Sequence, residues 1–267
     1  MPAVQLARLK NQIDWLAGFF AQPEEFQREL RQFFESYADW TYRPGLDIYD
    51  SIQMPAFHAP PLVMRQLDLS FGALGRSDPG SALAVVDRLW PELYLEARLF
   101  SAGLLGSVPA SHQNEVLNRL ESWCRPENER ILNRSLLTDG GRQVRRDAPD
   151  RWLELAEKWL TQTSPAAQAL GLRALLPLVE EPAFENLPAI FALAGPLLEG
   201  SVARLQNDLL NLLQALARRS PSETAFYLRQ VVSISDDPLV ARLARRCLPL
   251  LSPAGQSSLR SALTGRR

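Results

Sequence analysis

Trp123 and Glu127 are the residues whose types and spacing most clearly suggest chemistry. They lie four residues apart at a predicted helix junction, which Pro126 interrupts. An indole can stack on a sugar or a base, and a nearby carboxylate can stabilise developing positive charge. The alternative is structural: Trp123 fills the core and Glu127 offsets the dipole at a helix N-terminus. Spacing alone favours this structural interpretation, and Glu129 is an equally good candidate acid.

A cluster of arginines follows this junction, in a segment predicted to be a loop that begins at Gly140. Its members are Arg142, Arg145, Arg146 and Arg151. Guanidinium groups form charge-assisted hydrogen bonds with phosphates, so this cluster is a candidate phosphate site. The alternative is a solvated loop leading into a helix, with part of the charge offset by Asp139, Asp147 and Asp150.

Further arginines lie at or near the ends of successive predicted helices in the last seventy residues, which are basic on balance. They are Arg218, Arg219, Arg242, Arg245 and Arg246. Cations are common at helix C-termini, where they offset the dipole, and Arg218 and Arg219 need no other explanation. If helical repeats stack in register, the same arginines line one concave rim.

Common local catalytic signatures do not occur in this sequence. There is no glycine-rich phosphate loop, no His-Glu-x-x-His and no Gly-x-Ser-x-Gly. His58 and His112 are isolated and predicted to be solvated loop residues. The sequence therefore predicts no cofactor and no metal.

The totals describe a chain that can fill a core. It has 267 residues, 46% of them hydrophobic and 22% charged, with a net charge of -1 that argues against uniform coating of nucleic acid. Cys124 and Cys247 are far apart and form no metal or disulfide pattern, which fits a reducing cytoplasm. No signal-peptide pattern and no uninterrupted apolar run is present, so we expect a cytoplasmic protein without membrane contact.

Apolar residues recur three and four apart along most of the chain, which predicts an all-α protein. The expected helices are 3–20, 23–40, 61–74, 79–90, 92–106, 111–123, 126–138, 149–162, 165–180, 182–198, 201–219, 221–234, 237–251 and 253–264. Asp78, Ser220, Asp237 and Ser252 each precede a proline and are predicted N-caps. Helix pairs recur at roughly 35–45 residues, the period of HEAT-like repeats, so we expect an α–α superhelix.

Prolines interrupt the stretch 41–61, which is predicted to be irregular. It suggests a boundary between an N-terminal helical hairpin with its connector, residues 1–56, and a repeat solenoid, residues 57–267. Tyr42, Tyr49 and Phe57 indicate that the connector packs against the rest of the protein.

Several segments together resemble the HEAT-like DNA alkylation repair glycosylases, over roughly residues 57–250. The segments that carry the resemblance are Leu89-Trp90, Tyr94, Glu96-Ala97-Arg98, Ala102-Gly103-Leu104-Leu105, Trp123 with Glu127, Pro149, Trp159 and the helix beginning near Ser164. Trp123 with Glu127 is similar to that family's Trp-x-x-x-Asp active-site pattern. The resemblance implies removal of N3- and N7-alkylated purines from DNA.

The active-site pattern is degenerate, however. Glu127 replaces an aspartate, Ala166 stands at the second tryptophan, and Ala169 stands at an arginine that holds the DNA backbone in the family. We therefore expect double-stranded DNA binding with weak or absent base excision. A HEAT-type protein-interaction scaffold and an active alkylpurine glycosylase are the alternatives.

The predicted catalytic residue is Glu127. The predicted DNA-binding residues are Trp123, Arg142, Arg145, Arg146, Arg218, Arg242 and Arg245.

Overall fold

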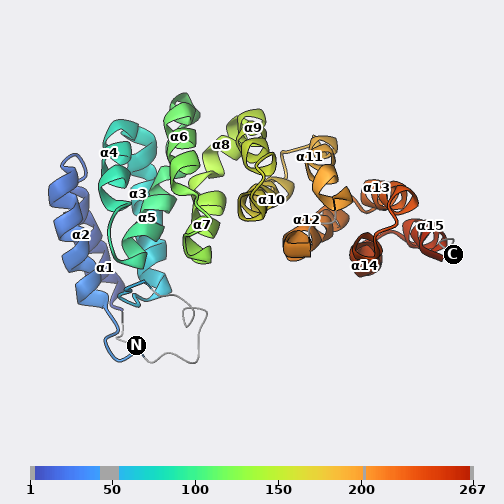
Figure 1. Cartoon of the computed structure of the whole chain (residues 1–267). Helices are drawn as coiled ribbons and strands as arrows, with labels where there is room; N and C mark the ends of the chain where they lie inside the picture. Colours follow the sequence, from blue (N-terminus) through green and yellow to red (C-terminus); the bar gives the residue numbers. More distant parts are fainter. Residues whose placement is uncertain (1–3, 43–53, 201–202, 265–267) are drawn as a thin grey trace. The chain divides into compact units, whose positions relative to one another are not determined.

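A computed structural model describes residues 4–42, 54–200 and 203–264, which contain fifteen α-helices and no strand (Figure 1). The all-α prediction is confirmed for these residues. The chain divides into two compact units, Met1–Ala148 and Pro149–Arg267. The boundary predicted between residues 56 and 57 lies inside the first unit, and the solenoid arrangement stays a prediction.

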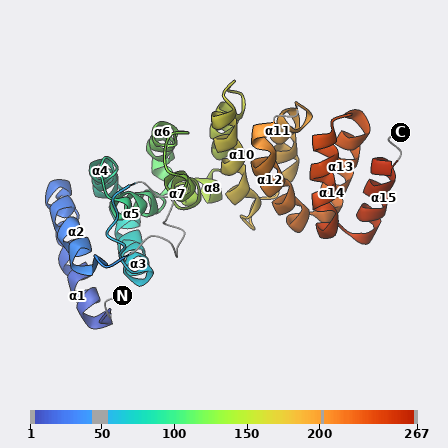
Figure 2. The same ribbon diagram turned by 60° about the horizontal axis from the view of Figure 1, so that its bottom comes forward.

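The first unit is built from two layers of helices (Figure 2). One layer contains α1 (Leu6–Ala17), α3 (Pro61–Ser77), α5 (Leu95–Leu105) and α7 (Arg130–Ser135), each packed on the next. The other contains α2 (Pro23–Tyr37) and α4 (Pro79–Leu89), which also pack together, followed by α6 (Gln113–Trp123). The unit ends with the π-helical turn η3 (Leu136–Gly140) and α8 (Arg142–Asp147), and a 3-10 turn, η2 (Ala110–His112), precedes α6.

An aromatic cluster packs α2 of the N-terminal hairpin against the rest of the first unit. Phe26 of α2 lies with its ring centroid 5.2 Å from that of Phe71 in α3 and 6.1 Å from that of Phe100 in α5. All three side chains are fully buried. Large aromatic side chains contribute much of the apolar area in a core, so this cluster joins both layers.

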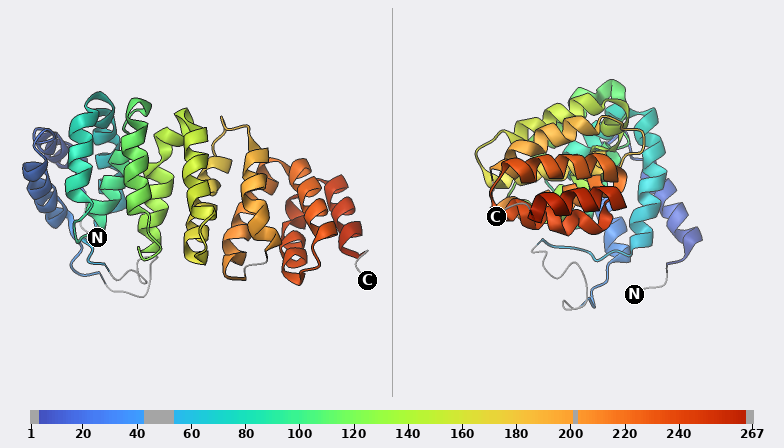
Figure 3. Two further views of the ribbon diagram at one scale, coloured as in Figure 1. Left: turned by 45° about the horizontal axis from the view of Figure 1, so that its top comes forward. Right: turned by 90° about the vertical axis from the view of Figure 1, so that its right-hand side faces the viewer.

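The second unit repeats the paired arrangement, as the yellow-to-red helices of Figure 3 show. Its helices are α9 (Pro149–Leu160), α10 (Pro165–Val179), α11 (Leu187–Glu199), α12 (Gln206–Arg219), α13 (Pro221–Ile234), α14 (Pro238–Cys247) and α15 (Pro253–Thr264), with 3-10 turns η4 (Ala203–Leu205) and η5 (Leu248–Leu250). The indole of Trp152 donates to the Ala174 carbonyl at 2.9 Å, which ties α9 to α10. The Arg173–Asp208 ion pair, at 2.8 Å, ties α10 to α12.

Three of the four predicted N-caps are confirmed. Asp78 accepts from the Ser81 amide at 3.1 Å, and Asp237 accepts from the Leu239 amide at 2.6 Å. Ser252 accepts from the Gly255 amide at 3.3 Å. The prediction was wrong at Ser220, whose side chain makes no capping bond, so Pro221 alone marks the start of α13.

The irregular connector is tested only in part, since residues 43–53, which include Tyr49, lie outside the described residues. Residues 41–42 and 54–60 are non-helical, as predicted, and Phe57 is buried. No helix in the described residues is long and apolar enough to cross a membrane. Cys124 and Cys247 are free, buried thiols, and burial raises the pKa of both.

Candidate functional site

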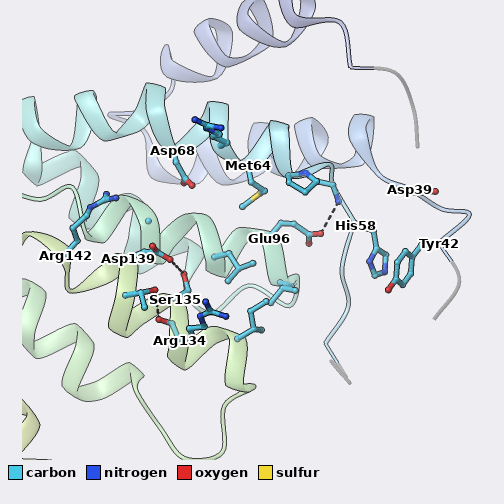
Figure 4. A pocket seen from close by; sticks show the side chains of 18 residues that line it. Asp39, Tyr42, His58, Met64, Asp68, Glu96, Arg134, Ser135, Asp139 and Arg142 are labelled. Atoms are coloured by element: carbon cyan, nitrogen blue, oxygen red, sulfur yellow. Dashed lines mark hydrogen bonds between the residues drawn. The ribbon is translucent and has the colours of Figure 1, made fainter. Parts of the chain in front are cut away.

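A pocket of about 750 Å³ opens in the first unit (Figure 4). Its walls come from residues 39–42 and 58–61, from α3 and α5, and from the consecutive elements α7, η3 and α8. Both acidic and basic side chains line it, together with the apolar Met64, Leu99 and Ile131. A concave site with an apolar surface and a few polar groups has the form of a ligand pocket.

A buried carboxylate fixes one wall of this pocket. Glu96 of α5 is 5% exposed and accepts from the Phe57 amide at 3.0 Å and the Ala59 amide at 3.3 Å. The Phe57 carbonyl accepts in turn from the Asp39 amide at 2.9 Å. These bonds satisfy backbone groups of residues 57–59, which belong to no helix, and they hold this segment against α5.

His58 lies in this fixed segment, in a left-handed backbone conformation with φ 53°. That region is costly for a residue other than glycine and persists only where the surroundings impose it. The imidazole stacks on Tyr42, with ring centroids 3.8 Å apart, and both rings line the pocket. The prediction of an isolated, solvated His58 was therefore wrong, because contacts distant in sequence build its surroundings. His112 lies 3.5 Å from the Glu115 carboxylate, in the 3-10 turn η2.

Asp68 of α3 and Asp139 of η3 line the same pocket, and Figure 4 shows their carboxyl groups directed into it. Asp139 accepts from the Ser135 hydroxyl at 2.9 Å. Asp68 and Asp139 are both exposed, although neighbouring protein atoms partly desolvate the Asp68 carboxyl group. This desolvation and the charge of Asp139 raise the pKa of Asp68 to about 6, although Arg142 opposes the shift.

Two glycines, Gly103 in α5 and Gly106 directly after it, lie close to these two aspartates. A Cβ at Gly106 would lie 1.7 Å from the Asp139 carbonyl oxygen, and one at Gly103 would lie 2.8 Å from an Asp68 carboxylate oxygen. The contact at Gly106 is with backbone and could not be relieved without moving η3, so the absence of a side chain there lets η3 approach the end of α5. At Gly103 only the Asp68 side chain would have to move.

The turn that carries Asp139 is π-helical, since the Gly141 amide donates to the Leu136 carbonyl at 3.0 Å. The sequence predicted one continuous helix over 126–138. The structure instead begins α7 at Arg130 and passes into the π-turn at Leu136. Such turns are rare, and they occur frequently at functional sites.

The arginine-rich segment after Gly140 is helical, which corrects the prediction of a loop. Arg142 and Arg146 of α8 are exposed, and Arg142 lines the pocket. Arg145 is 5% exposed, and its guanidinium donates to the Leu137 and Thr138 carbonyls at the end of η3. Arg145 therefore completes the backbone hydrogen bonding of this turn, which argues against a phosphate contact.

The predicted pair Trp123 and Glu127 does not line the pocket. The Trp123 indole stacks on that of Trp90, with ring centroids 4.7 Å apart, and the Arg98 guanidinium lies 5.7 Å from the Trp90 centroid. Trp123 is half-buried, and Glu127 is exposed in the turn that follows α6. This arrangement matches the structural interpretation of Trp123 more closely than the chemical one.

The remaining predicted residues lie in the second unit. Arg218 is exposed at the end of α12, and Arg242 and Arg245 are exposed on α14. These arginines form a candidate surface of the second unit.

The described residues combine an all-helical fold with a pocket that is lined by charged side chains. A scan against protein-family models matches residues 71–247 to the family described as DNA alkylation repair enzyme. The match spans more than half of the chain, and the chain belongs to this family. No curated protein and no solved structure matches the chain.

Sequence reasoning missed Asp68 as a site residue and treated Asp139 only as an offset to the arginines. It also missed Arg65 of α3 and Arg134 of α7, which line the pocket. The available signal was Gly103, since a glycine inside a helix often has a packing reason. Among the described residues, no group of three or more acidic, histidine or cysteine side chains is placed to hold a metal ion.

Proposed function

We propose that this protein binds double-stranded DNA, with weak or absent excision of alkylated bases. Its membership in the DNA alkylation repair enzyme family, over residues 71–247, is the observation that carries this proposal. Two features of the described residues support it: an arginine-bearing helix face in the second unit and the surroundings of Trp123 and Glu127 in the first.

The arginine-bearing face belongs to α14. Val240, Leu243 and Cys247 are buried, while Arg242, Arg245 and Arg246 are exposed. Residues three and four apart share a helix face, so the three guanidinium groups project to one side. The helix contains no acidic residue, and within the described residues none of the three arginines has an ion-pair partner. Arginines that share one helix face and have no acidic partner can contact successive phosphates of a DNA backbone.

The C-terminal part of the second unit supports this assignment. Residues 201–267 contain ten arginines and four acidic residues, although the net charge of the chain is only -1. Arg219 is excluded from the candidate contacts, because its guanidinium donates to the Pro182 and Phe184 carbonyls. Exposed Arg218 is the remaining candidate at the end of α12.

Weak or absent excision is proposed from the surroundings of Trp123 and Glu127. Loss of a cationic alkylpurine requires an anion beside the developing sugar cation, in a site that excludes water. Glu127 is exposed, where solvent screens its charge, and one face of the Trp123 ring is occupied by Trp90. Neither arrangement favours catalysis by this pair.

Fluorescence anisotropy with a labelled duplex at two salt concentrations tests the binding. We expect saturable binding at low salt that weakens steeply at higher salt, because neutralised phosphates release counterions. No change in anisotropy at low salt would end the proposal. Unlabelled polyglutamate, an acidic homopolymer, serves as a competitor. Equal competition by polyglutamate and by unlabelled DNA would show that the interaction is only non-specific charge attraction.

The second alternative, an active alkylpurine glycosylase, is tested by release of 7-methylguanine from methylated DNA. We expect wild type and Glu127→Gln to give little or no release. A rapid release that Glu127→Gln abolishes would restore Glu127 as the catalytic acid.

The scaffold alternative is motivated by apolar side chains on the surface of the first unit, including Trp15 and Trp40, which are 67% and 72% exposed. It predicts a protein partner that is recovered in a pull-down after nuclease treatment. Failure of DNA binding together with such a partner would favour it.

A further inference from the structure

The pocket of the first unit carries charges of both signs that the proposed DNA-binding surface on α14 does not require. We propose that this pocket binds a small zwitterion with an aromatic side chain, either an amino acid or a short peptide. Asp68 and Asp139 hold its ammonium group, and Arg134 and Arg142 hold its carboxylate. Such a ligand does not come from DNA, so the inference goes beyond the proposed function.

The charged side chains of the pocket do not neutralise one another by direct contact. Within the described residues, the side chains of Arg65, Asp68, Arg134 and Arg142 form no ion pair and no hydrogen bond, although all four line the same cavity. Asp139 accepts from the Ser135 hydroxyl at 2.9 Å. A ligand that brings both an ammonium group and a carboxylate can form charge-assisted hydrogen bonds with both kinds of side chain at once.

Asp68 and Asp139 form the part of the pocket that favours an ammonium group. Partial desolvation and the charge of Asp139 raise the pKa of Asp68 to about 6, and Arg142 opposes this shift without forming an ion pair. An ammonium group between the two carboxylates removes their repulsion and donates hydrogen bonds to them. A ligand that carries only a negative charge leaves the repulsion in place.

Arg134 and Arg142 form the part of the pocket that favours a carboxylate. Arg134 lies on α7 and Arg142 is the first residue of α8, so η3 separates them in the chain. Arg145 donates to the Leu137 and Thr138 carbonyls, which fixes the turn between the two arginines. The fork of a guanidinium group matches the two oxygens of a carboxylate, which gives this part of the site its geometric specificity.

The remaining walls suit an aromatic side chain. Met64, Leu99 and Ile131 provide apolar surface from three different helices, and the stacked rings of Tyr42 and His58 provide aromatic surface. A volume of about 750 Å³ lies within the range of sites that enclose small molecules, roughly 300–1,000 Å³, and admits a short peptide as well as a single amino acid.

Contacts within the protein hold these walls in place. The Glu96 carboxylate accepts from the Phe57 and Ala59 amides, on both sides of His58. Gly106 lets η3, which carries Asp139, lie against the end of α5. A site that is already ordered loses less conformational entropy on binding, which favours a ligand site over an incidental hollow.

Calorimetry at pH 7 with the wild-type protein tests for the ligand and distinguishes its two sources. The probes are tryptophan, tryptophyl-glycine and glycyl-tryptophan, which share an indole ring and differ in the separation of their charged ends. Tightest binding of tryptophan would support a free amino acid, and tightest binding of a dipeptide would support a short peptide. No saturable binding of any of the three would overturn the proposal.

Blocking one charged end at a time tests the zwitterion. The tightest of the three probes is compared with its N-acetyl derivative, which has no ammonium group, and with its amide, which has no carboxylate. We expect each derivative to bind about tenfold more weakly, because one set of charge-assisted hydrogen bonds is lost. An affinity equal to that of the unblocked probe, for either derivative, would overturn the proposal. This comparison uses the wild-type protein, so it does not depend on whether a variant folds.

Two variants then assign the charged ends to residues. Asp68→Asn should weaken binding of the unblocked probe about tenfold and leave its N-acetyl derivative within twofold. Arg142→Gln should weaken the unblocked probe by about threefold to fivefold and leave its amide within twofold. Unchanged binding of the unblocked probe by both variants would contradict the assignment, and so would an equal loss for both derivatives.

Asp14→Asn and Arg146→Gln are the matched controls, since they make the same charge changes at exposed positions outside the pocket. Losses equal to those of Asp68→Asn and Arg142→Gln would assign the effect to net charge and contradict the pocket. The Arg242→Ala, Arg245→Ala protein should bind the probe as the wild type does. Saturable duplex binding without any probe binding would reject the pocket proposal alone, and probe binding without duplex binding would reject the DNA-binding proposal alone.

Discussion

The pocket of the first unit and the exposed face of α14 in the second unit both present arginines, but different side chains accompany them. In the pocket, Arg134 and Arg142 alternate with Asp68 and Asp139. On α14, three arginines share a face in a helix without any acidic residue. A surface with only positive charges attracts any polyanion and supplies affinity. A site with charges of both signs fixes the orientation of a ligand and supplies selectivity. We propose that α14 supplies affinity for DNA, whereas the pocket carries charges of both signs.

The strongest test of the pocket's construction is a substitution at Gly106. Gly106→Ala places a Cβ against the Asp139 carbonyl and should destabilise the first unit by about 2–3 kcal/mol, because backbone atoms of η3 must move. The free energy of unfolding in urea measures the change. Gly72→Ala in α3 is the control, since only the tip of Arg76 lies near its Cβ, and it should stabilise by roughly 0.5–1 kcal/mol. A Gly106→Ala protein as stable as wild type would show that η3 is not held by close contact.

The next largest effect concerns DNA binding by α14. Arg242→Ala with Arg245→Ala should weaken duplex binding about tenfold at moderate salt, because two phosphate contacts are lost. Arg28→Ala with Arg31→Ala is the matched control. Those arginines of α2 are exposed but paired with Glu25 and Glu35, so their charge is already neutralised. Anisotropy measures both variants, and equal losses would mean that α14 has no special role.

The smallest effect is the pH dependence of stability. The pKa of Asp68 in the folded protein, about 6, is above its ordinary value of 3.8. The folded state therefore binds more protons between these values, and stability attributable to Asp68 is lost as the pH rises through this window. Asp68→Asn should raise the melting temperature at pH 8 by roughly 1–3 °C and have little effect at pH 4. Thermal unfolding at the two pH values measures this, and a larger gain at pH 4 would reverse the sign of the argument.

Much of the helix pattern could be predicted, because proline marks the starts so clearly. The predicted starts at Pro61, Pro79, Pro149, Pro165, Pro221 and Pro253 coincide with those of the structure. The region from Pro126 to Asp147 could not be predicted as well. Gly140 and Gly141 suggested a loop, whereas a π-turn and the buried Arg145 allow a helix to resume at Arg142.

The candidate site was less predictable than the helices. Asp68 and Asp139 are far apart in sequence, and neither belongs to a local motif. Gly106 permits close approach of η3, which carries Asp139, to the end of α5, and spacing along one helix does not reveal such a contact between elements. Trp123 and Glu127, by contrast, formed a conspicuous local pattern, but tertiary contacts place Trp123 on Trp90 and leave Glu127 exposed.

The salt dependence of duplex binding, compared between wild type and the Arg242→Ala, Arg245→Ala protein, tests the central claim most directly. The account predicts a linear fall of log affinity with log salt concentration in wild type, and a slope that is shallower by about two in the variant. A wild-type affinity that does not change with salt, or identical slopes in the two proteins, would contradict DNA backbone binding by α14.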